Sequence, residues 1–203
     1  MNEDNSPNAC LESAAAILIH VARRSLADCV DGNRTLPPAD LPREGVLGRP
    51  SGVFVTLRRG GRLRGCIGLP EPELPMVEAC WQAAQQAALE DPRFPPVAPG
   101  ELEDLDLEVS VLSPSTELGR IEDFEPGRHG AVLEAAGRRS LFLPEVAVET
   151  GWDTEQFFDH LAMKAGLPAR AWQLPEARIL RFTTVTSRGP ALPAGGRERN
   201  GSH

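Results

Sequence analysis

Two adjacent glycines, Gly60 and Gly61, separate two runs of residues that favour β-strands. The first run covers residues 52–57, and the second covers residues 62–69. Glycine tolerates the positive φ angles that a two-residue hairpin turn requires. We therefore predict an antiparallel β-hairpin at this point, and any fold assigned to the chain has to contain it.

The rest of the chain mixes helical and strand-like patterns. Apolar residues at helical spacing predict helices over residues 9–30, 73–90 and 153–165. Alternating or β-branched residues predict strands over residues 105–111 and 179–186 and a second hairpin over residues 131–143. Because hairpins are mixed with scattered helices, and the regular rhythm of a doubly wound sheet is missing, we predict an α+β fold with a largely antiparallel sheet packed by helices.

The chain is expected to form one structural domain over residues 9–186. A proline-rich connection over residues 34–50 is expected to be irregular. Residues 187–203 are rich in Gly, Pro and Arg and carry few apolar side chains, so we predict a disordered tail.

Composition limits the classes of function. Lys and Arg total 21 and Asp and Glu total 29, and the formal net charge of −8 argues against a broad nucleic-acid-binding surface. No apolar run reaches the roughly 18 residues of a membrane span, and the acidic N-terminus resembles no secretory signal. We expect a cytoplasmic protein with reduced cysteines and no membrane association. No nucleotide motif and no metal-ligand spacing is present, so neither a cofactor nor a metal site is predicted.

The most unusual stretch is residues 63–68, which contain a cysteine between two glycines. In a strand, Arg64 and Cys66 project from the same face, roughly 6–7 Å apart. An arginine beside a thiol favours the nucleophilic thiolate. Gly65 and Gly68 are typical of a bulge or of a close approach by a ligand or another backbone. Together these residues predict a shaped, ligand-binding site around an activated thiol.

The same hairpin also supports a purely structural interpretation. With a two-residue turn and no bulge, Leu57 lies opposite Arg64, and Val55 lies opposite Cys66. Opposed residues share a face of the sheet. Cys66 would then be buried among aliphatic side chains, and both interpretations of the cysteine stay open.

Three other residues are candidates for the site. His129 lies in a glycine-containing loop and could act as an acid or base toward Cys66. Asp91 and Arg93 flank Pro92 and could bind a polar or anionic ligand. Their alternative role is to pin a proline-rich loop through hydrogen bonds.

Several motifs resemble those of the AMMECR-one domain family, also called AmmeMemoRadiSam system protein A. They are GVFVTL (52–57), LRGCIG (63–68), DPRF (91–94), LEVSVL (107–112), HG (129–130), FLP (142–144), GW (151–152) and KAGL (164–167). They occur in the family's order and cover about residues 10–185. The resemblance implies an α+β fold with a larger and a smaller lobe and a cleft between them. It also implies a Memo-like protein and a radical-SAM protein as partners, and it places the family's cysteine at Cys66, but it names no reaction.

The residues leave two functions open. In the first, the chain is a thiol-dependent enzyme or substrate-handling subunit that uses Cys66, with Arg64 favouring the thiolate and His129 as acid or base. In the second, it is a non-catalytic binding module, whose glycine-flanked hairpin and 91–94 loop dock a protein partner. The reactivity of Cys66 discriminates between them.

Overall fold

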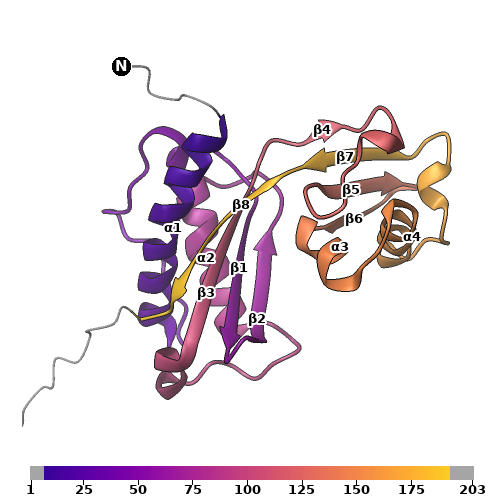
Figure 1. The fold of residues 1–203 in the computed structure, drawn as a ribbon. Coiled ribbons are helices and arrows are strands. Elements are labelled where there is room, and N and C mark those ends of the chain that lie inside the picture. Colours follow the sequence, from indigo (N-terminus) through magenta and orange to yellow (C-terminus); the bar gives the residue numbers. More distant parts are fainter. Residues whose placement is uncertain (1–6, 193–203) are drawn as a thin grey trace, which may run out of the picture. The chain divides into compact units, whose positions relative to one another are not determined.

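The computed structural model describes residues 7–192, which form two compact units (Figure 1). The first unit takes the chain up to Val111 and from Val185 onward, and the second comprises Leu112–Thr184. Helices and antiparallel strands occur in both units, so the predicted α+β class is confirmed. The predicted single sheet is in fact two four-stranded sheets, one in each unit.

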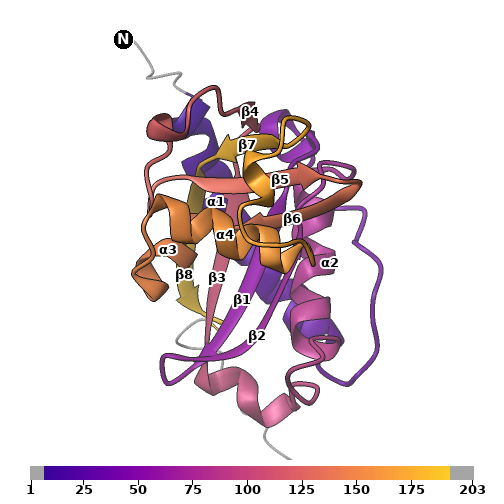
Figure 2. The same cartoon turned by 90° about the vertical axis from the view of Figure 1, so that its right-hand side faces the viewer.

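The first unit is a sheet covered by two helices. Its strands lie in the order β2-β1-β3-β8, which Figure 2 shows side by side. They are β1 (Val53–Arg59), β2 (Arg62–Leu69), β3 (Leu105–Leu112) and β8 (Thr184–Pro190). The helices are α1 (Pro7–Cys29) and α2 (Met76–Leu89), with short 3-10 turns at Gly45–Gly48 and Pro99–Asp104. The hydrophobic core lies between the helices and one face of the sheet, and it contains Val55, Leu57 and Trp81.

The second unit contains the sheet β4-β7-β5-β6 and two helices. Its strands are β4 (Thr116–Glu117), β5 (Gly130–Ala135), β6 (Arg138–Phe142) and β7 (Arg178–Phe182). Its helices are α3 (Pro144–Thr150) and α4 (Thr154–Lys164), with 3-10 turns at Ile121–Asp123 and Ala171–Gln173. The core of this unit is built around Phe157, Phe158 and Leu161 of α4. Sequence patterns did not predict α3, which begins at Pro144, where the second hairpin was expected to end.

Both predicted hairpin turns are present. Gly60 and Gly61 adopt φ angles of 55° and 78°, and Arg59 pairs with Arg62 across them. Beyond the turn, however, Arg58 pairs with Leu63 while Leu57 pairs with Gly65, so Arg64 is an extra residue in a β-bulge. The predicted register is therefore wrong beyond this point. Thr56, and not Val55, lies opposite Cys66.

The predicted end of the ordered chain is also wrong. Strand β8 continues to Pro190, and Ala191 is 1% exposed and donates its N–H to the Leu105 carbonyl at 2.7 Å. Arg23 of α1 donates to the Pro190 carbonyl at 2.7 Å. This segment is held both by these backbone groups and by the side chains of Ala191 and Leu192, which pack on the core of the first unit. The rest of the predicted tail, residues 193–203, lies outside the described residues.

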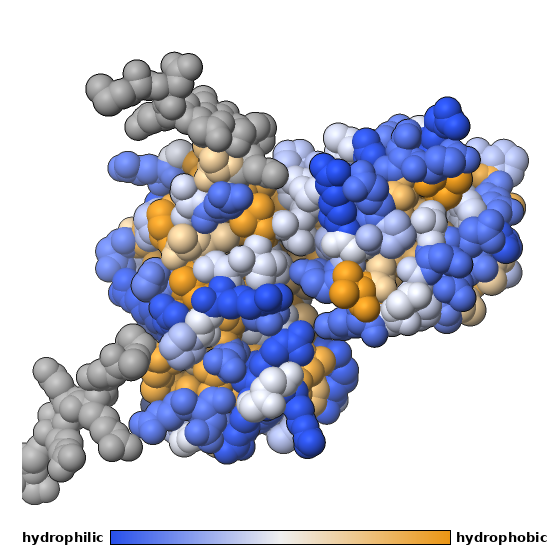
Figure 3. Space-filling model, in the orientation of Figure 1, coloured by the Kyte–Doolittle hydropathy of each residue, from blue (hydrophilic) through white to orange (hydrophobic). Residues whose placement is uncertain are grey.

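The surface carries polar and apolar residues intermixed. In the view of Figure 3, hydrophobic residues of each unit appear in separate groups among hydrophilic ones. Over residues 7–192, none of the helices has the length and apolar character that a membrane crossing requires.

Candidate functional site

Cys66 lies on the face of the sheet that points away from α1 and α2, beside the hydroxyl of Thr56. The backbone N–H of Cys66 donates to Asp91 Oδ2 at 2.8 Å, and its carbonyl accepts from Arg93 Nη2 at 3.2 Å. Both backbone groups therefore point away from β1, which is typical of a pair whose side chains lie close together. Accordingly, Thr56 Oγ1 donates to Cys66 Sγ at 3.1 Å. The bulge has moved the thiol from the core face to this polar face.

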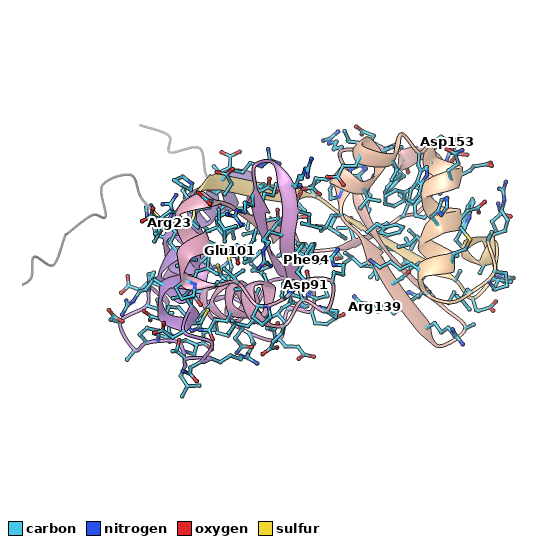
Figure 4. All side chains as sticks on the ribbon, turned by 90° about the horizontal axis from the view of Figure 1, so that it is seen from below. Arg23, Asp91, Phe94, Glu101, Arg139 and Asp153 are labelled. Carbon is cyan, nitrogen blue, oxygen red and sulfur yellow. The ribbon has the colours of Figure 1, made fainter. Side chains whose placement is uncertain are left out.

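The side chain of Asp91 is almost fully buried, and both of its oxygens are occupied. Besides the Cys66 N–H, it accepts from the Arg93 backbone N–H at 3.1 Å, from Arg93 Nε at 3.0 Å and from Arg93 Nη2 at 2.7 Å. The Arg93 guanidinium is the main reason that the pKa of Asp91 is held well below its usual range. These contacts fit the loop-pinning role, because they tie the 91–94 loop, on which Figure 4 labels Asp91 and Phe94, to the open edge of β2.

The electrostatic environment of the Cys66 thiol combines opposing effects. Burial raises its pKa above the ordinary value, and the charge of Asp91 acts in the same direction, whereas the Thr56 hydrogen bond and the charges of Arg93 and Arg58 act to lower it. The net effect is a neutral thiol at pH 7. The side chain of Arg93 is 54% exposed, so a guanidinium beside the thiol is open to solvent.

Arg64 has a different role from the one that strand alternation predicts. Its Nε and Nη2 donate to the two carboxylate oxygens of Glu101 at 3.0 and 2.9 Å. Its Nη1 donates to the Pro95 carbonyl at 2.9 Å, and its Nη2 also donates to the Pro96 carbonyl at 3.3 Å. The side chain is only 13% exposed, and the ion pair lowers the pKa of Glu101 to about 2. Arg64 therefore holds the loop after α2, and the guanidiniums that act on the thiol belong to Arg93 and Arg58.

The two glycines beside Cys66 allow close contacts within the protein. A Cβ on Gly65 would collide with the carbonyl oxygen of Ala87, because α2 lies directly against β2 at this point. A Cβ on Gly68 would collide with the ring of Phe54. We predicted that both glycines bind a ligand. In the structure, each of them lies against a group of the protein itself.

His129 belongs to the second unit, where its side chain forms a hydrogen bond within its own loop. Its Nδ1 accepts from the backbone N–H of Glu125 at 3.0 Å, and burial lowers its pKa. The neutral ring therefore carries its proton on Nε2. A role as general base toward Cys66 would require the Glu125 hydrogen bond to break, and the pairing of these two residues stays a prediction.

Thr56 and Arg58 were not among the predicted site residues. They share the outer face of β1 by simple alternation, and the sequence could have identified them only if the bulge had been known. Among the other cysteines, Cys29 and Cys80 are buried and Cys10 is exposed. In the part of the chain that the structure describes, no group of three or more His, Cys, Asp or Glu side chains could hold a metal ion.

Comparison with known proteins identifies relatives over most of the chain. The family model AMMECR1 matches residues 19–187. A protein of Methanothermobacter thermautotrophicus is 45% identical over 81% of this chain and 88% of its own length. Protein TK0174 of Thermococcus kodakarensis is also 45% identical, over 82% of this chain and 85% of its own.

A solved structure has the same fold. The uncharacterized protein PH0010 of Pyrococcus horikoshii matches with a TM-score of 0.77 and 36% sequence identity, over 88% of this chain and 98% of its own. The names of these three relatives state no activity. The resemblance predicted from the motifs is confirmed.

Proposed function

This chain belongs to the AMMECR1 family, and from that premise we propose that it is a thiol-dependent enzyme or substrate-handling subunit that works through Cys66. The observation that carries the proposal is the position of Sγ on the polar face of the sheet, beside the Thr56 hydroxyl and the Arg93 guanidinium. Of the cysteines, Cys29 and Cys80 are buried in the core, and Cys10 lies on an exposed part of α1. Cys66 alone combines partial exposure with polar and cationic neighbours.

The chemistry follows from the surroundings of the sulfur. The resting thiol is neutral and becomes nucleophilic when it loses its proton to solvent or to a basic group of the substrate. The resulting thiolate accepts the Thr56 hydrogen bond and is attracted by Arg93 and Arg58. Asp91 holds the Cys66 backbone, so the sulfur keeps its position while its charge changes.

Thiol labelling tests the proposal. The folded chain is treated briefly with iodoacetamide, and the modified cysteines are identified by peptide mass spectrometry. Cys66 is expected to react well before Cys29 and Cys80, because burial raises the pKa of Cys29 to about 11 and that of Cys80 further. Its rate should keep rising above pH 9, since its own pKa is raised. The proposal is overturned if Cys66 is labelled only under conditions that also label the two core cysteines.

A second candidate function is a non-catalytic binding module. The raised pKa of Cys66 favours it, because little thiolate is present at neutral pH. A Cys66→Ser variant decides between the two functions. A binding module keeps its affinity for a protein partner in this variant, whereas a thiol-dependent protein loses its chemistry while the fold is retained.

We also propose, from the family resemblance, that the chain acts in the cytoplasm with a Memo-like protein and a radical-SAM protein. Co-expression of the three proteins followed by affinity purification tests this proposal. Recovery of either partner in stoichiometric amount supports the assembly. Recovery no greater than with an unrelated protein of equal charge refutes it.

A further inference from the structure

The outer face of the first unit's sheet carries a row of polar side chains that begins at Cys66. Next to it on β1 lies Thr56, and next to Thr56 on β3 lies Glu108. Arg188 of β8 reaches Glu108 Oε1 at 3.1 Å, and Arg58 of β1 reaches the same oxygen at 3.2 Å. Two guanidiniums therefore share one carboxylate, whose side chain is only 16% exposed. Asp106 lies opposite Arg58 on β3, so the charges of this row balance, and the guanidinium of Arg58 lies near the thiol as part of an ion-paired network.

Besides Arg58, the guanidinium of Arg93 lies near Cys66, at the edge of the sheet. Arg93 is about half exposed and is paired with Asp91. Asp91 also accepts hydrogen bonds from two backbone N–H groups, those of Cys66 and Arg93. Arg93 and Arg58 both act on the charge of the same sulfur.

Each guanidinium can meet a ligand without leaving a buried carboxylate unpaired. If Arg58 turns away, Glu108 keeps its bond to Arg188. Arg93 holds Asp91 and the Cys66 carbonyl through Nε and Nη2, and because its side chain is 54% exposed, a ligand can reach the guanidinium while Asp91 stays paired. Leaving a buried charge without a partner is what makes the breaking of such ion pairs costly, and both pairs avoid it.

We propose that this face binds an oxyanion, a carboxylate or phosphate group of a thiol-reactive substrate, through Arg58 and Arg93, with the reacting atom of the substrate at Cys66 Sγ. The inference rests on the proposed function and adds to it the chemical class of the substrate. Arginine suits this role, because its planar guanidinium binds carboxylates and phosphates through two parallel hydrogen bonds.

The experiment compares a neutral and an anionic reagent at the same sulfur. Iodoacetamide and iodoacetate both react by attack of the thiolate on the CH2 carbon; an S–C bond forms, iodide leaves with the electrons of the C–I bond, and the thiol proton goes to the buffer. The ratio of the iodoacetate rate to the iodoacetamide rate at Cys66 is divided by the same ratio for N-acetylcysteine. We expect a value of about five, the factor that one opposite charge at about 4 Å gives in water.

Substitutions test which residues make Cys66 prefer the anionic reagent. Arg93→Gln and Arg58→Gln should each lower the normalised ratio, and the double variant should bring it close to one. Arg62→Gln is the matched control, because it removes the same charge from an exposed position of the same hairpin and should leave the ratio unchanged. Inorganic phosphate should slow the reaction of the wild-type chain with iodoacetamide, and it should slow that of Arg93→Gln much less.

The outcomes separate the two proposals. If Cys66 reacts with iodoacetamide but the normalised ratio is close to one, the oxyanion site is refuted and the proposed function survives. An equal loss in Arg62→Gln also refutes the site, because the effect would then be one of net charge. If neither reagent modifies Cys66 in the folded chain, both proposals fail. Should Arg93→Gln lose the native fluorescence of Trp81, phosphate protection of the wild-type chain decides: protection supports the site, and its absence overturns it.

Discussion

Replacement of Asp91 by Asn tests the contact on which the position of Cys66 depends. Asp91 Oδ2 accepts from Cys66 N and Arg93 Nη2, and Oδ1 accepts from Arg93 N and Nε. Asparagine has the same shape but only one acceptor oxygen, so its NH2 group must face two N–H donors. The variant thus loses two hydrogen bonds to a charged group, each of which contributes about 1.5–3 kcal/mol.

The expected destabilisation is smaller than the sum of the two bonds. Arg93 is about half exposed, so water replaces part of what its guanidinium loses. We therefore expect Asp91→Asn to lower the free energy of unfolding by about 2–3 kcal/mol. For a chain of this length, that corresponds to a fall in Tm of about 5–10 °C.

Unfolding of the first unit has its own fluorescent reporter. Trp81 is fully buried in that unit, and the other two tryptophans, Trp152 and Trp172, lie in the second. The measurement is made on chains in which these two are replaced by Phe, so that fluorescence reports the first unit alone. Asp106→Asn, at an exposed position of the same unit, controls for the change of charge.

The dependence on pH separates the loss of charge from a change in packing. Since the folded-state pKa of Asp91 is depressed, its ionised form stabilises the fold above the unfolded pKa of about 4, and this contribution is lost as pH falls below that value. The difference between wild type and Asp91→Asn should be constant between pH 6 and 8 and should shrink in acid. A Tm within 1 °C of the Asp106→Asn control, or a difference that persists in acid, would refute the reasoning.

Three further changes should affect stability in ways that the contacts specify. Gly65→Ala should lower the free energy of unfolding, measured in urea, by about 2 kcal/mol, because the new methyl group meets the α2 backbone. In the control Gly100→Ala, the methyl group enters open space, and the free energy of unfolding should change by less than about 0.5 kcal/mol. Arg64→Leu should also lower the free energy of unfolding by about 2 kcal/mol, because its hydrogen bonds to Glu101 and Pro95 are lost. It should leave the pH dependence of Cys66 alkylation unchanged. Truncation after Ser187 removes the second half of β8 and should lower the Tm by about 3–6 °C in a calorimetric scan, and a change below 1 °C would contradict the packing of this strand.

Local sequence patterns predicted the positions of turns and helices better than they predicted which strands pair in a sheet. The glycine turn of the first hairpin is present, and the helix predicted over residues 153–165 is found as Thr154–Lys164, because each depends on residues close in the sequence. The final strand illustrates the opposite case. The predicted single strand over residues 179–186 is two strands in two different sheets, a division that no local pattern encodes.

The candidate site shows the same limit at the level of single residues. The cysteine, the aspartate and the second arginine of the predicted site do lie together, as Cys66, Asp91 and Arg93. Loop pinning was one of the two roles predicted for Asp91 and Arg93, but the partner of Asp91 was not predictable, because Asp91 lies 25 positions from Cys66 along the chain and its bond to the strand edge is a long-range contact. The role predicted for His129 toward Cys66 stays a prediction, and its Nδ1 is engaged within its own loop by the backbone N–H of Glu125.

The bulge at Arg64 explains why the three residues of the Arg-Gly-Cys motif have three different roles. A one-residue shift in register transfers every following side chain to the other face of a sheet. Arg64, the extra residue, directs its guanidinium to Glu101 and the loop after α2. Gly65 then faces α2, where only a residue without a Cβ fits, and Cys66 faces Thr56 on the polar side. Without the bulge, the arginine would occupy the helix contact and the thiol would be buried beside Val55, so the position of a potentially reactive sulfur depends on an irregularity that strand alternation alone cannot reveal.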